Sequence, residues 1–366
     1  ITPAGYETPL AEKLARFKEE FADFNLPEPT VFQSRPLHFR LRAEFRIVHH
    51  GERIDYAMFG PDNPKLPVVI DSFPIAAEGI HALMPRLRDA LQANDTLKTA
   101  LFQVDFLATL SGEAMVTLIY RRPVSPEWAE AAGQLAATLN IQVIGRSRGC
   151  KTVIGRDWLE EAFELDGRTL RYRQIEGSFS QPNGEVNRKM LSWARSQAAG
   201  KGGDLLELYC GNGNFTAALA PLFRKVLATE VAKSSVVAAE HNFAANGLDN
   251  IKVFRLSSEE ISAALAGTQT FRRLEGTDLG EYEFSTIFVD PPRSGLDPLT
   301  LELARRFDNI LYISCNPQTL RENVRALHDT HEIAASAIFD QFPYTHHLES
   351  GLLLTRRPKA TVPQGI

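Results

Sequence analysis

The sequence predicts an α/β protein in which a doubly wound, mostly parallel sheet follows a smaller α+β domain. Short apolar runs alternate with helical stretches after residue 203, a pattern typical of a doubly wound sheet. Strand-like runs between residues 40 and 146 instead follow one another in hairpin-like succession, with two helical stretches between them. With 366 residues, the chain is long enough for two domains of ordinary size.

The first elements read as a helix followed by the α+β domain. A helix is expected over residues 7–23, because Leu10, Leu14, Phe17 and Phe21 recur at steps of three and four. Further along, strands are expected over residues 40–47, 55–59, 68–71, 102–110, 114–120 and 141–146, and helices over 75–93 and 125–139. The expected organisation is an N-terminal helix in 1–30, an α+β RNA-binding domain in 31–173 and a catalytic domain in 174–366, with residues 174–183 as a linker.

The second half carries the strands of the parallel sheet. They are expected over residues 204–209, 225–230, 251–256, 285–290 and 309–314, each preceding a helical stretch. Two further runs, around 333–339 and 350–355, close the sheet.

Composition indicates an ordinary globular protein. The net charge is −5, so the total does not point to nucleic acid, and residues 31–173 carry 18 Lys or Arg against 17 Asp or Glu. No run reaches the ~20 apolar residues of a membrane helix, and the charged N-terminal segment lacks the apolar core of a signal peptide. The three cysteines stand far apart, which argues against a disulfide framework or a clustered metal site. We therefore expect a reduced, cytoplasmic protein.

A glycine pair follows the first strand of the second half. Gly211 and Gly213 allow a sharp turn and a close approach to a ligand, although a dinucleotide fingerprint would have a third glycine where Thr216 stands. Glu230 ends the next strand at a spacing of about 20 residues, at which a carboxylate accepts hydrogen bonds from ribose hydroxyls. A plain turn and a solvated strand end remain the alternative, but the acidic partner favours a nucleoside cofactor.

Two further strand ends carry chemistry. Asp290-Pro291-Pro292-Arg293 follows the fourth strand, and Cys315 follows the fifth, directly before Asn316 and Pro317, a good helix N-cap and first helical residue. A thiol at a helix N-terminus is expected to favour the thiolate. A rigid turn with a surface ion pair, and a buried inert cysteine, are the respective alternatives. The adjacent His346 and His347 are expected to point apart along a strand, so no metal is predicted.

Taken together, these motifs resemble one protein family. Eight stretches between residues 42 and 349 carry the resemblance: RAEFRI, DSFP, SFSQPN, DLLELYCGNGNF, ATE, IFVDPPRSGLD, LYISCNP and DQFPYTHHLE. The succession of DPPRSGLD, SCNP and HHLE is highly specific. On these residues the chain is similar to the bacterial tRNA (uracil-5-)-methyltransferases, which make 5-methyluridine in the T-loop of tRNA.

The resemblance implies a fold, a reaction and roles for residues. The fold would be a Rossmann-like class I methyltransferase domain behind an RNA-binding domain, with S-adenosylmethionine as methyl donor and neither a metal nor an iron–sulfur cluster. The RNA would be bound by its T-arm with the target uridine flipped out, and tmRNA could serve as well; no membrane and no obligate protein partner are expected. Cys315 would add to C6 of uracil, and Glu349 would remove the C5 proton. The expected cofactor-site residues are Gln181, Tyr209, Gly211, Asn214, Glu230 and Asp290.

Substrate contacts are expected from arginines in both halves. From its place beside Asp290, Arg293 could hydrogen-bond the charged O4 or O2 that develops on the uracil. Arg40, Arg42 and Arg46, interleaved with aromatic residues, could hold phosphates and stack bases. A solvated arginine face over an aromatic core explains these three equally well.

Three other functions fit the sequence less well than that of a tRNA uracil methyltransferase. The sister family that methylates uridine in ribosomal RNA carries a four-cysteine iron–sulfur site. If Cys315 is the nucleophile, only Cys150 and Cys210 are left here as ligands, which is too few for such a site. An adenine amino-methyltransferase would need no cysteine nucleophile. A non-catalytic RNA-binding or RNA-folding protein would not need the intact glycine turn, Glu230, Cys315 and Glu349.

Overall fold

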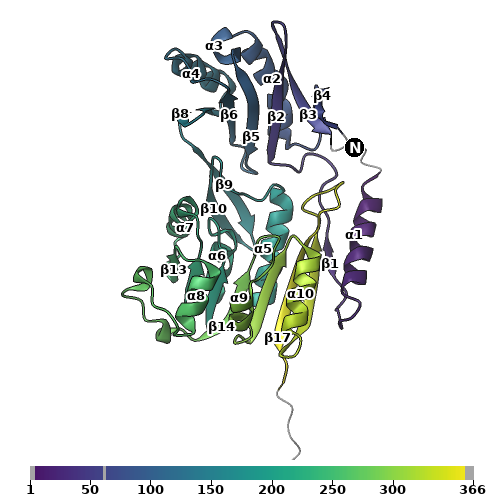
Figure 1. Ribbon diagram of the computed structural model, residues 1–366, viewed down its shortest axis with the longest axis vertical. Coiled ribbons are helices and arrows are strands. Elements are labelled where there is room, and N and C mark those ends of the chain that lie inside the picture. The colour runs from purple at the N-terminus through teal and green to yellow at the C-terminus, as the bar shows by residue number, and fades with distance from the viewer. Residues whose placement is uncertain (1–4, 61–62, 359–366) are drawn as a thin grey trace, which may run out of the picture. The chain divides into compact units, whose positions relative to one another are not determined.

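The computed structural model describes residues 5–60 and 63–358, so the outermost residues of the expected N-terminal helix segment and of the catalytic domain lie outside it. The chain forms two compact units (Figure 1). The first unit joins the segment up to Ser34 with the segment from Val186 onward, and the second unit is Arg35–Glu185. Both ends of the chain therefore contribute to the first unit.

An eight-stranded sheet organises the first unit. Its order is β1-β16-β17-β15-β14-β11-β12-β13, and neighbours run parallel except at β17, which is antiparallel to β15 and to β16. The strands are β1 (Thr30–Phe32), β11 (Asp204–Leu208), β12 (Val226–Thr229), β13 (Ile251–Phe254), β14 (Phe284–Val289), β15 (Asn309–Ser314), β16 (His331–Phe339) and β17 (Glu349–Arg356). The prediction of a doubly wound, mostly parallel sheet is confirmed.

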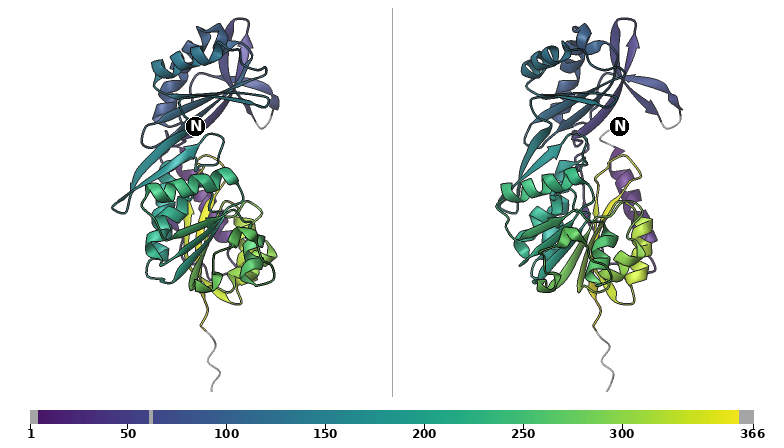
Figure 2. Two further views of the ribbon diagram at one scale, coloured as in Figure 1. Left: turned by 90° about the vertical axis from the view of Figure 1, so that its left-hand side faces the viewer. Right: turned by 60° about the vertical axis from the view of Figure 1, so that its left-hand side comes forward.

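Helices lie on both faces of this sheet (Figure 2). They are α1 (Glu7–Glu20), α5 (Gly184–Ala198), α6 (Asn214–Leu219), α7 (Lys233–Ala245), α8 (Ser258–Leu265), α9 (Pro298–Ala304) and α10 (Pro317–Leu327). Local sequence sets several of their starts. Ser257 and Glu260 form a capping box at α8, while Asp297 and Asn316 cap α9 and α10, each ahead of a proline.

The core of the first unit includes the N-terminal helix. All residues of β11 and β15 are buried, as expected for strands covered on both faces. Phe17 of α1 and Phe21, the residue that follows this helix, are fully buried in the same apolar cluster as these strands, with ring centroids 4.8 Å apart. The helix therefore packs as part of the first unit instead of standing apart from it.

The second unit is a smaller α+β fold. Its seven-stranded sheet has the order β4-β3-β2-β5-β6-β7-β8, antiparallel except between β6 and β7. A separate hairpin joins β9 and β10. The elements are β2 (Arg42–His50), β3 (Arg53–Gly60), β4 (Asn63–Ile70), α2 (Glu78–Gln92), α3 (Asp95–Lys98), β5 (Leu101–Ala108), β6 (Ala114–Tyr120), α4 (Trp128–Leu139), β7 (Gln142–Ser147), β8 (Cys150–Ile154), β9 (Trp158–Leu165) and β10 (Arg168–Ile175).

The segment interpreted as a linker is held by hydrogen bonds within the second unit. Arg42 donates to the carbonyl of Ser178 (2.7 Å), and the backbone N–H of Leu41 donates to the carbonyl of Pro182 (2.7 Å). The polar, proline-containing sequence looks like a linker because its partners, at the start of β2, are far away in the chain. Among the residues that the structure describes, no helix is long and apolar enough to cross a membrane.

Candidate active site

The turn after β11 needs its glycines. Tyr209, Gly211 and Gly213 all have positive φ angles, of 60°, 57° and 81°. A Cβ on Gly213 would collide with the ring of Phe243 on α7. The backbone can therefore turn tightly at the carboxyl end of β11, where open α/β sheets bind their ligands.

Glu230 joins this turn to the end of β12. One of its carboxylate oxygens accepts a hydrogen bond from the backbone N–H of Gly211 (3.0 Å), and the other accepts one from Ala232 (2.8 Å). The carboxylate is thereby held beside the glycine turn, which is the arrangement expected of an acceptor for ribose hydroxyls.

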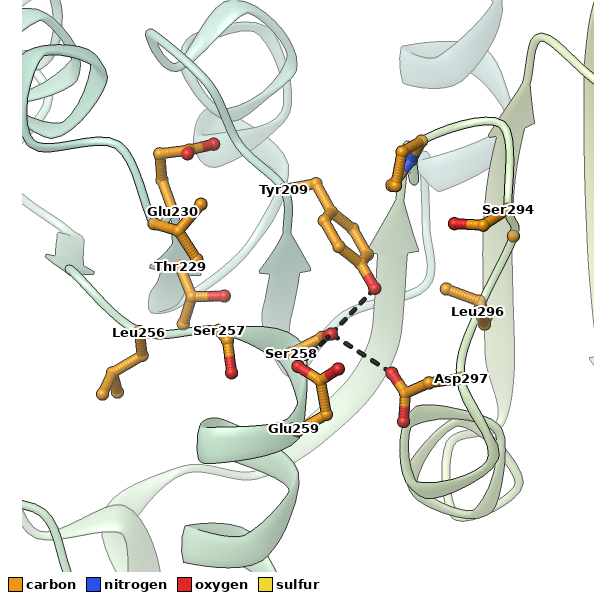
Figure 3. A pocket seen from close by; sticks show the side chains of 13 residues that line it. Tyr209, Thr229, Glu230, Leu256, Ser257, Ser258, Glu259, Ser294, Leu296 and Asp297 are labelled. Atoms are coloured by element: carbon orange, nitrogen blue, oxygen red, sulfur yellow. Dashed lines mark hydrogen bonds between the residues drawn. The ribbon is translucent and has the colours of Figure 1, made fainter.

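A pocket of about 450 Å³ opens beside the turn (Figure 3). Its wall contains Tyr209, whose hydroxyl donates to Oγ of Ser258 (2.8 Å), and Ser258 in turn donates to Oδ2 of Asp297 (3.2 Å). Glu230 lines the same pocket. A pocket lined by residues that follow β11, β12 and β14, with the Glu230 carboxylate in its wall, fits a nucleoside cofactor. Sequence reasoning missed Ser258 and Asp297, although Asp297 before Pro298 is a recognisable helix start.

Two other predicted cofactor residues are placed differently. Asn214 forms a reciprocal amide pair with Asn187 of α5, with N···O distances of 3.1 and 2.8 Å, so it ties α6 to α5. Gln181 belongs to the second unit, whereas the pocket lies entirely in the first. Their roles toward a cofactor remain predictions.

The ends of three neighbouring strands bring the candidate catalytic groups together. Asp290 follows β14 and Cys315 follows β15. Ser314 of β15 pairs with Ser350 of antiparallel β17, so Cys315 comes opposite Glu349, which opens β17 and is buried. Side chains directly opposite each other on antiparallel strands lie about 5 Å apart at Cβ, which is close enough for both to act on the same substrate ring.

The helix after Cys315 is anchored to the segment that carries Arg293. Asn316 accepts from the backbone N–H of Gln318 (3.2 Å) and donates through Nδ2 to the carbonyl of Arg293 (2.8 Å). Thr319 donates to the same carbonyl (3.1 Å). The start of α10 and the loop after β14 are thus held in one geometry.

The protonation of the site differs from the sequence-based expectation. Burial raises the pKa of the Cys315 thiol to about 11, and the carboxyls of Glu349 and Asp290 add to this, while Arg293 opposes it. Burial, helped by mutual repulsion, raises the pKa of Glu349 well above its usual range, and burial likewise raises that of Asp290. The expectation that the helix N-terminus would favour the thiolate is therefore wrong, because burial and two carboxyls outweigh the helix terminus.

A third buried acid lies below the glycine turn. Glu207 in the middle of β11 is 1% exposed, and burial raises its pKa to about 8, with a smaller contribution from Asp290. Its Oε2 has no hydrogen-bond partner among the residues that the structure describes. Sequence reasoning missed this group, although a glutamate inside the apolar run of β11 is an unusual choice that could have signalled it.

Arg293 is paired with a histidine. Its guanidinium donates to Nδ1 of His347 (3.0 Å), and burial, followed by the neighbouring His346, lowers the pKa of His347. The two histidines lie in the loop before β17, with ring centroids 4.2 Å apart, so the premise that they point apart on a strand is wrong. Within residues 5–60 and 63–358, no group of three or more His, Cys, Asp or Glu could hold a metal ion.

The three arginines of the second unit have different surroundings. Arg40 donates to the carbonyl of Arg42 (2.8 Å), and Arg42 donates to Ser178. Arg46 instead stacks its guanidinium on the ring of Phe102 at 3.9 Å, and Arg121 lies over the same ring at 4.7 Å. Arg46, Phe102 and Arg121 form what we call the arginine–phenylalanine stack, a cationic and aromatic group of side chains. The sequence predicted Arg46 as an RNA contact but missed Phe102 and Arg121.

The fold and the pocket define the class of protein. A doubly wound sheet with a late antiparallel strand, a glycine turn and a carboxylate at the next strand end are the features of an S-adenosylmethionine-dependent methyltransferase, the class to which the matching family model also assigns the chain. A family model described as tRNA (Uracil-5-)-methyltransferase matches residues 5–357. The chain belongs to this family, as the resemblance implied.

Individual relatives agree with this assignment. The tRNA/tmRNA (uracil-C(5))-methyltransferase of Aromatoleum aromaticum is 65% identical over 363 residues, which cover 99% of each chain. The protein of the same name from an Azoarcus species is 66% identical over 354 residues, covering 97% of each chain. Among solved structures, the Pyrococcus abyssi tRNA (uracil-54, C5)-methyltransferase in complex with S-adenosyl-L-homocysteine shares the fold, with a TM-score of 0.72, 21% identity and coverage of 96% of this chain and 84% of that one.

The pocket geometry predicts a cofactor phenotype for Glu230. Replacing Glu230 by alanine should weaken S-adenosylmethionine binding by about 1.5–3 kcal/mol, or roughly 10- to 100-fold in Kd, because a charge-assisted acceptor is lost. Isothermal titration of the purified protein measures this. Glu240→Ala, an exposed glutamate on α7, is the matched control and should leave the Kd unchanged. Equal affinity of Glu230→Ala and wild type would remove Glu230 from the cofactor site.

Proposed function

We propose that this enzyme transfers a methyl group from S-adenosylmethionine to C5 of a uridine in the T-loop of tRNA, and that tmRNA is a second substrate. The observation that carries the proposal is the opposition of the Cys315 thiol and the Glu349 carboxyl at two neighbouring strand ends, with Asp290 and Arg293 beside them. The printed names of the relatives, tRNA/tmRNA (uracil-C(5))-methyltransferases, support the substrate. Because tRNA is the substrate, we propose that the enzyme acts in the cytoplasm.

The residue types match a reaction at a poorly nucleophilic carbon. C5 of uracil becomes reactive when a thiolate adds to C6: a bond forms from Sγ of Cys315 to C6, and the C5–C6 π electrons move into an enolate that spans C5 and O4. The thiol must first lose its proton, and Asp290 and Glu349, whose carboxyls raise the pKa of this thiol, can accept it in their carboxylate forms. We assign to Arg293, which donates to His347, a hydrogen bond to the developing charge on O4 or O2.

The second half of the reaction requires a base. When bound, S-adenosylmethionine supplies an electrophilic methyl group to C5, and we assign its site to Tyr209, Gly211, Glu230 and Asp290, with Gln181 and Asn214 as further candidates. The C5 proton must then leave to Glu349, which has to be in its carboxylate form and to have released any proton taken from the thiol, while the electrons of the C5–H bond restore the double bond and expel Cys315. A carboxyl whose pKa is raised by burial holds that proton more firmly than an ordinary glutamate would.

The second unit offers a surface for the rest of the RNA. The arginine–phenylalanine stack combines two cations with an aromatic ring, which suits an unpaired base or a phosphate of a folded loop. We propose that Arg46 contacts RNA through it. Arg40 and Arg42 are proposed as weaker contributors, since backbone carbonyls already take hydrogen bonds from their guanidinium groups. Extruding the target uridine from the loop costs a few kcal/mol, which such contacts would offset.

The mechanism predicts that a base-deficient enzyme stalls. Glu349→Gln, incubated with a T-arm stem-loop and labelled methyl donor, should accumulate a covalent protein–RNA adduct that already carries the methyl group, and turnover should fall by about 10²- to 10⁴-fold. Denaturing gels detect the adduct. Wild-type enzyme should form a stable adduct with RNA containing 5-fluorouridine, because fluorine cannot leave as a cation, and Cys315→Ala should form neither adduct.

Two results would contradict this proposal. A fluorouridine adduct that persists in Cys315→Ala would remove the nucleophile assignment. Methylation confined to ribosomal RNA fragments, with none on the T-arm stem-loop, would replace the tRNA assignment by that of a ribosomal RNA uridine methyltransferase.

The arginine–phenylalanine stack predicts a salt-dependent phenotype. Arg46→Ala should raise the KM for RNA and flatten its dependence on salt, because RNA binding releases fewer counterions when a phosphate contact is missing. Cofactor affinity should not change. Arg42→Ala is the matched control from the same strand and should have the smaller effect on the salt slope; a larger effect at Arg42 would return Arg46 to a structural role.

A further inference from the structure

A buried lysine links the N-terminal helix to the loop that precedes Glu349. Nζ of Lys13 on α1 donates to Oδ1 of Asp340 (2.7 Å) and to the carbonyl of Phe342 (2.8 Å). The Lys13 and Asp340 side chains are 3% and 2% exposed. A residue near the start of the chain is thus bonded to two positions more than 300 residues later.

Two more side chains of this N-terminal segment hold the same loop. The hydroxyl of Tyr6 hydrogen-bonds the carboxylate of Asp340 and accepts from the backbone N–H of Ser34 (2.8 Å). Arg16, one turn beyond Lys13 on α1, donates to the carbonyl of His346. The N-terminal segment is therefore bonded to the loop at three positions, Asp340, Phe342 and His346.

This loop depends on such bonds because the sheet does not continue into it. Pairing between β16 and β17 stops at Phe339 and Glu349, and residues 340–348 connect the two strands. Inside the loop, Thr345 donates to the carbonyl of Phe342, and Tyr344 adopts a left-handed φ of 62°. The loop delivers two groups of the active site: His347, which holds Arg293, and Glu349, which opens β17.

The energetic cost of burying charges suggests that the Lys13–Asp340 ion pair does more than stabilise the fold. Taking a lysine and an aspartate out of water costs several kcal/mol per ion, so a buried pair often adds little net stability compared with apolar side chains of similar size. What such a pair does supply is one defined geometry, since only the arrangement with both charges satisfied avoids that cost.

We propose that Lys13, assisted by Arg16, is a positioning residue for the catalytic base: it fixes the β16–β17 loop so that Glu349 faces Cys315 and His347 holds Arg293. This inference rests on the proposed function, because it gives Glu349 the role of base. It assigns the N-terminal helix a part in the reaction although no residue of that helix belongs to the groups gathered around Cys315.

The test compares Lys13→Met and Arg16→Ala with the matched control Lys18→Met. Lys18 lies on the same helix but forms an exposed ion pair with Glu28, so its loss should leave the kinetics unchanged. Lys13→Met should lower kcat by about 10- to 100-fold, as expected when a base is displaced by an ångström, with the KM for S-adenosylmethionine unaltered. Arg16→Ala, which removes an exposed side chain, should lower kcat several-fold.

A second readout separates positioning from mere loss of folded protein. Slow proton removal should make the methylated covalent adduct accumulate in Lys13→Met and Arg16→Ala during turnover on a T-arm stem-loop, as predicted for Glu349→Gln. Partial unfolding would lower kcat without any adduct. If Lys13→Met does not fold, the double variant Lys13→Met/Asp340→Leu removes both buried charges and restores an apolar contact, and it should show the same adduct.

The outcomes distinguish this inference from the function on which it rests. If wild-type enzyme forms no adduct with fluorouridine RNA, the proposed function fails and the positioning role fails with it. If the wild-type adduct forms but Arg16→Ala and a folded Lys13 variant show wild-type kcat and no accumulated methylated adduct, the positioning role alone is overturned.

Discussion

Antiparallel pairing of β17 with β15, in the register that sets Ser314 opposite Ser350, is the constraint on which the active site depends. Parallel strands alone bring carboxyl ends together, and they supply the glycine turn, Glu230, Asp290 and Cys315 at one edge. Only an antiparallel neighbour can add the beginning of a strand to that edge. A slip of one residue would turn Glu349 to the opposite face of the sheet, so the register determines whether the Cys315 thiol and the Glu349 carboxyl meet.

The same arrangement concentrates acidic groups where water is excluded. Glu207, Asp290 and Glu349 all have raised pKa values because burial disfavours their charged forms, and the Cys315 thiol responds in the same direction. A protein built only for stability would not bury three carboxyls in this way. Two of them, Asp290 and Glu349, also raise the pKa of the Cys315 thiol, and perturbed groups gathered in this way are typical of sites in which protons are taken up and released.

Much of the fold could be predicted from the sequence because parallel strands produce short, fully apolar runs. The five runs from residue 204 onward match β11 to β15 closely, and motif and resemblance proposed Cys315 and Glu349 as site residues. The antiparallel insertion of β17 could not be found this way, since periodicity does not reveal strand direction. The strands β9 and β10 were missed because Glu161 interrupts the apolar residues on the buried face of β9, and because β10 buries only Leu170 and Tyr172.

Other features were hidden because they depend on contacts across the whole chain. The loop that carries Glu349 is bonded to Lys13, and local sequence gives no indication that this lysine is buried. The arginines of the second unit illustrate the same limit: Arg40, Arg42 and Arg46 share one sequence pattern, but only Arg46 stacks on Phe102. Side-chain roles of this kind follow from packing, which single-sequence patterns do not contain.

In the mechanism proposed for this enzyme, Cys315 and Glu349 together exchange the C5 hydrogen of a uridine for a methyl group. The most direct measurement uses tRNA labelled with tritium at C5 of its uridines and follows tritium release and methyl incorporation in the same reaction. The account predicts that wild-type enzyme releases tritium to water in step with methyl transfer, and that Cys315→Ala does neither. Methyl incorporation with full retention of tritium would show that the methyl group goes to another atom, and would contradict the account.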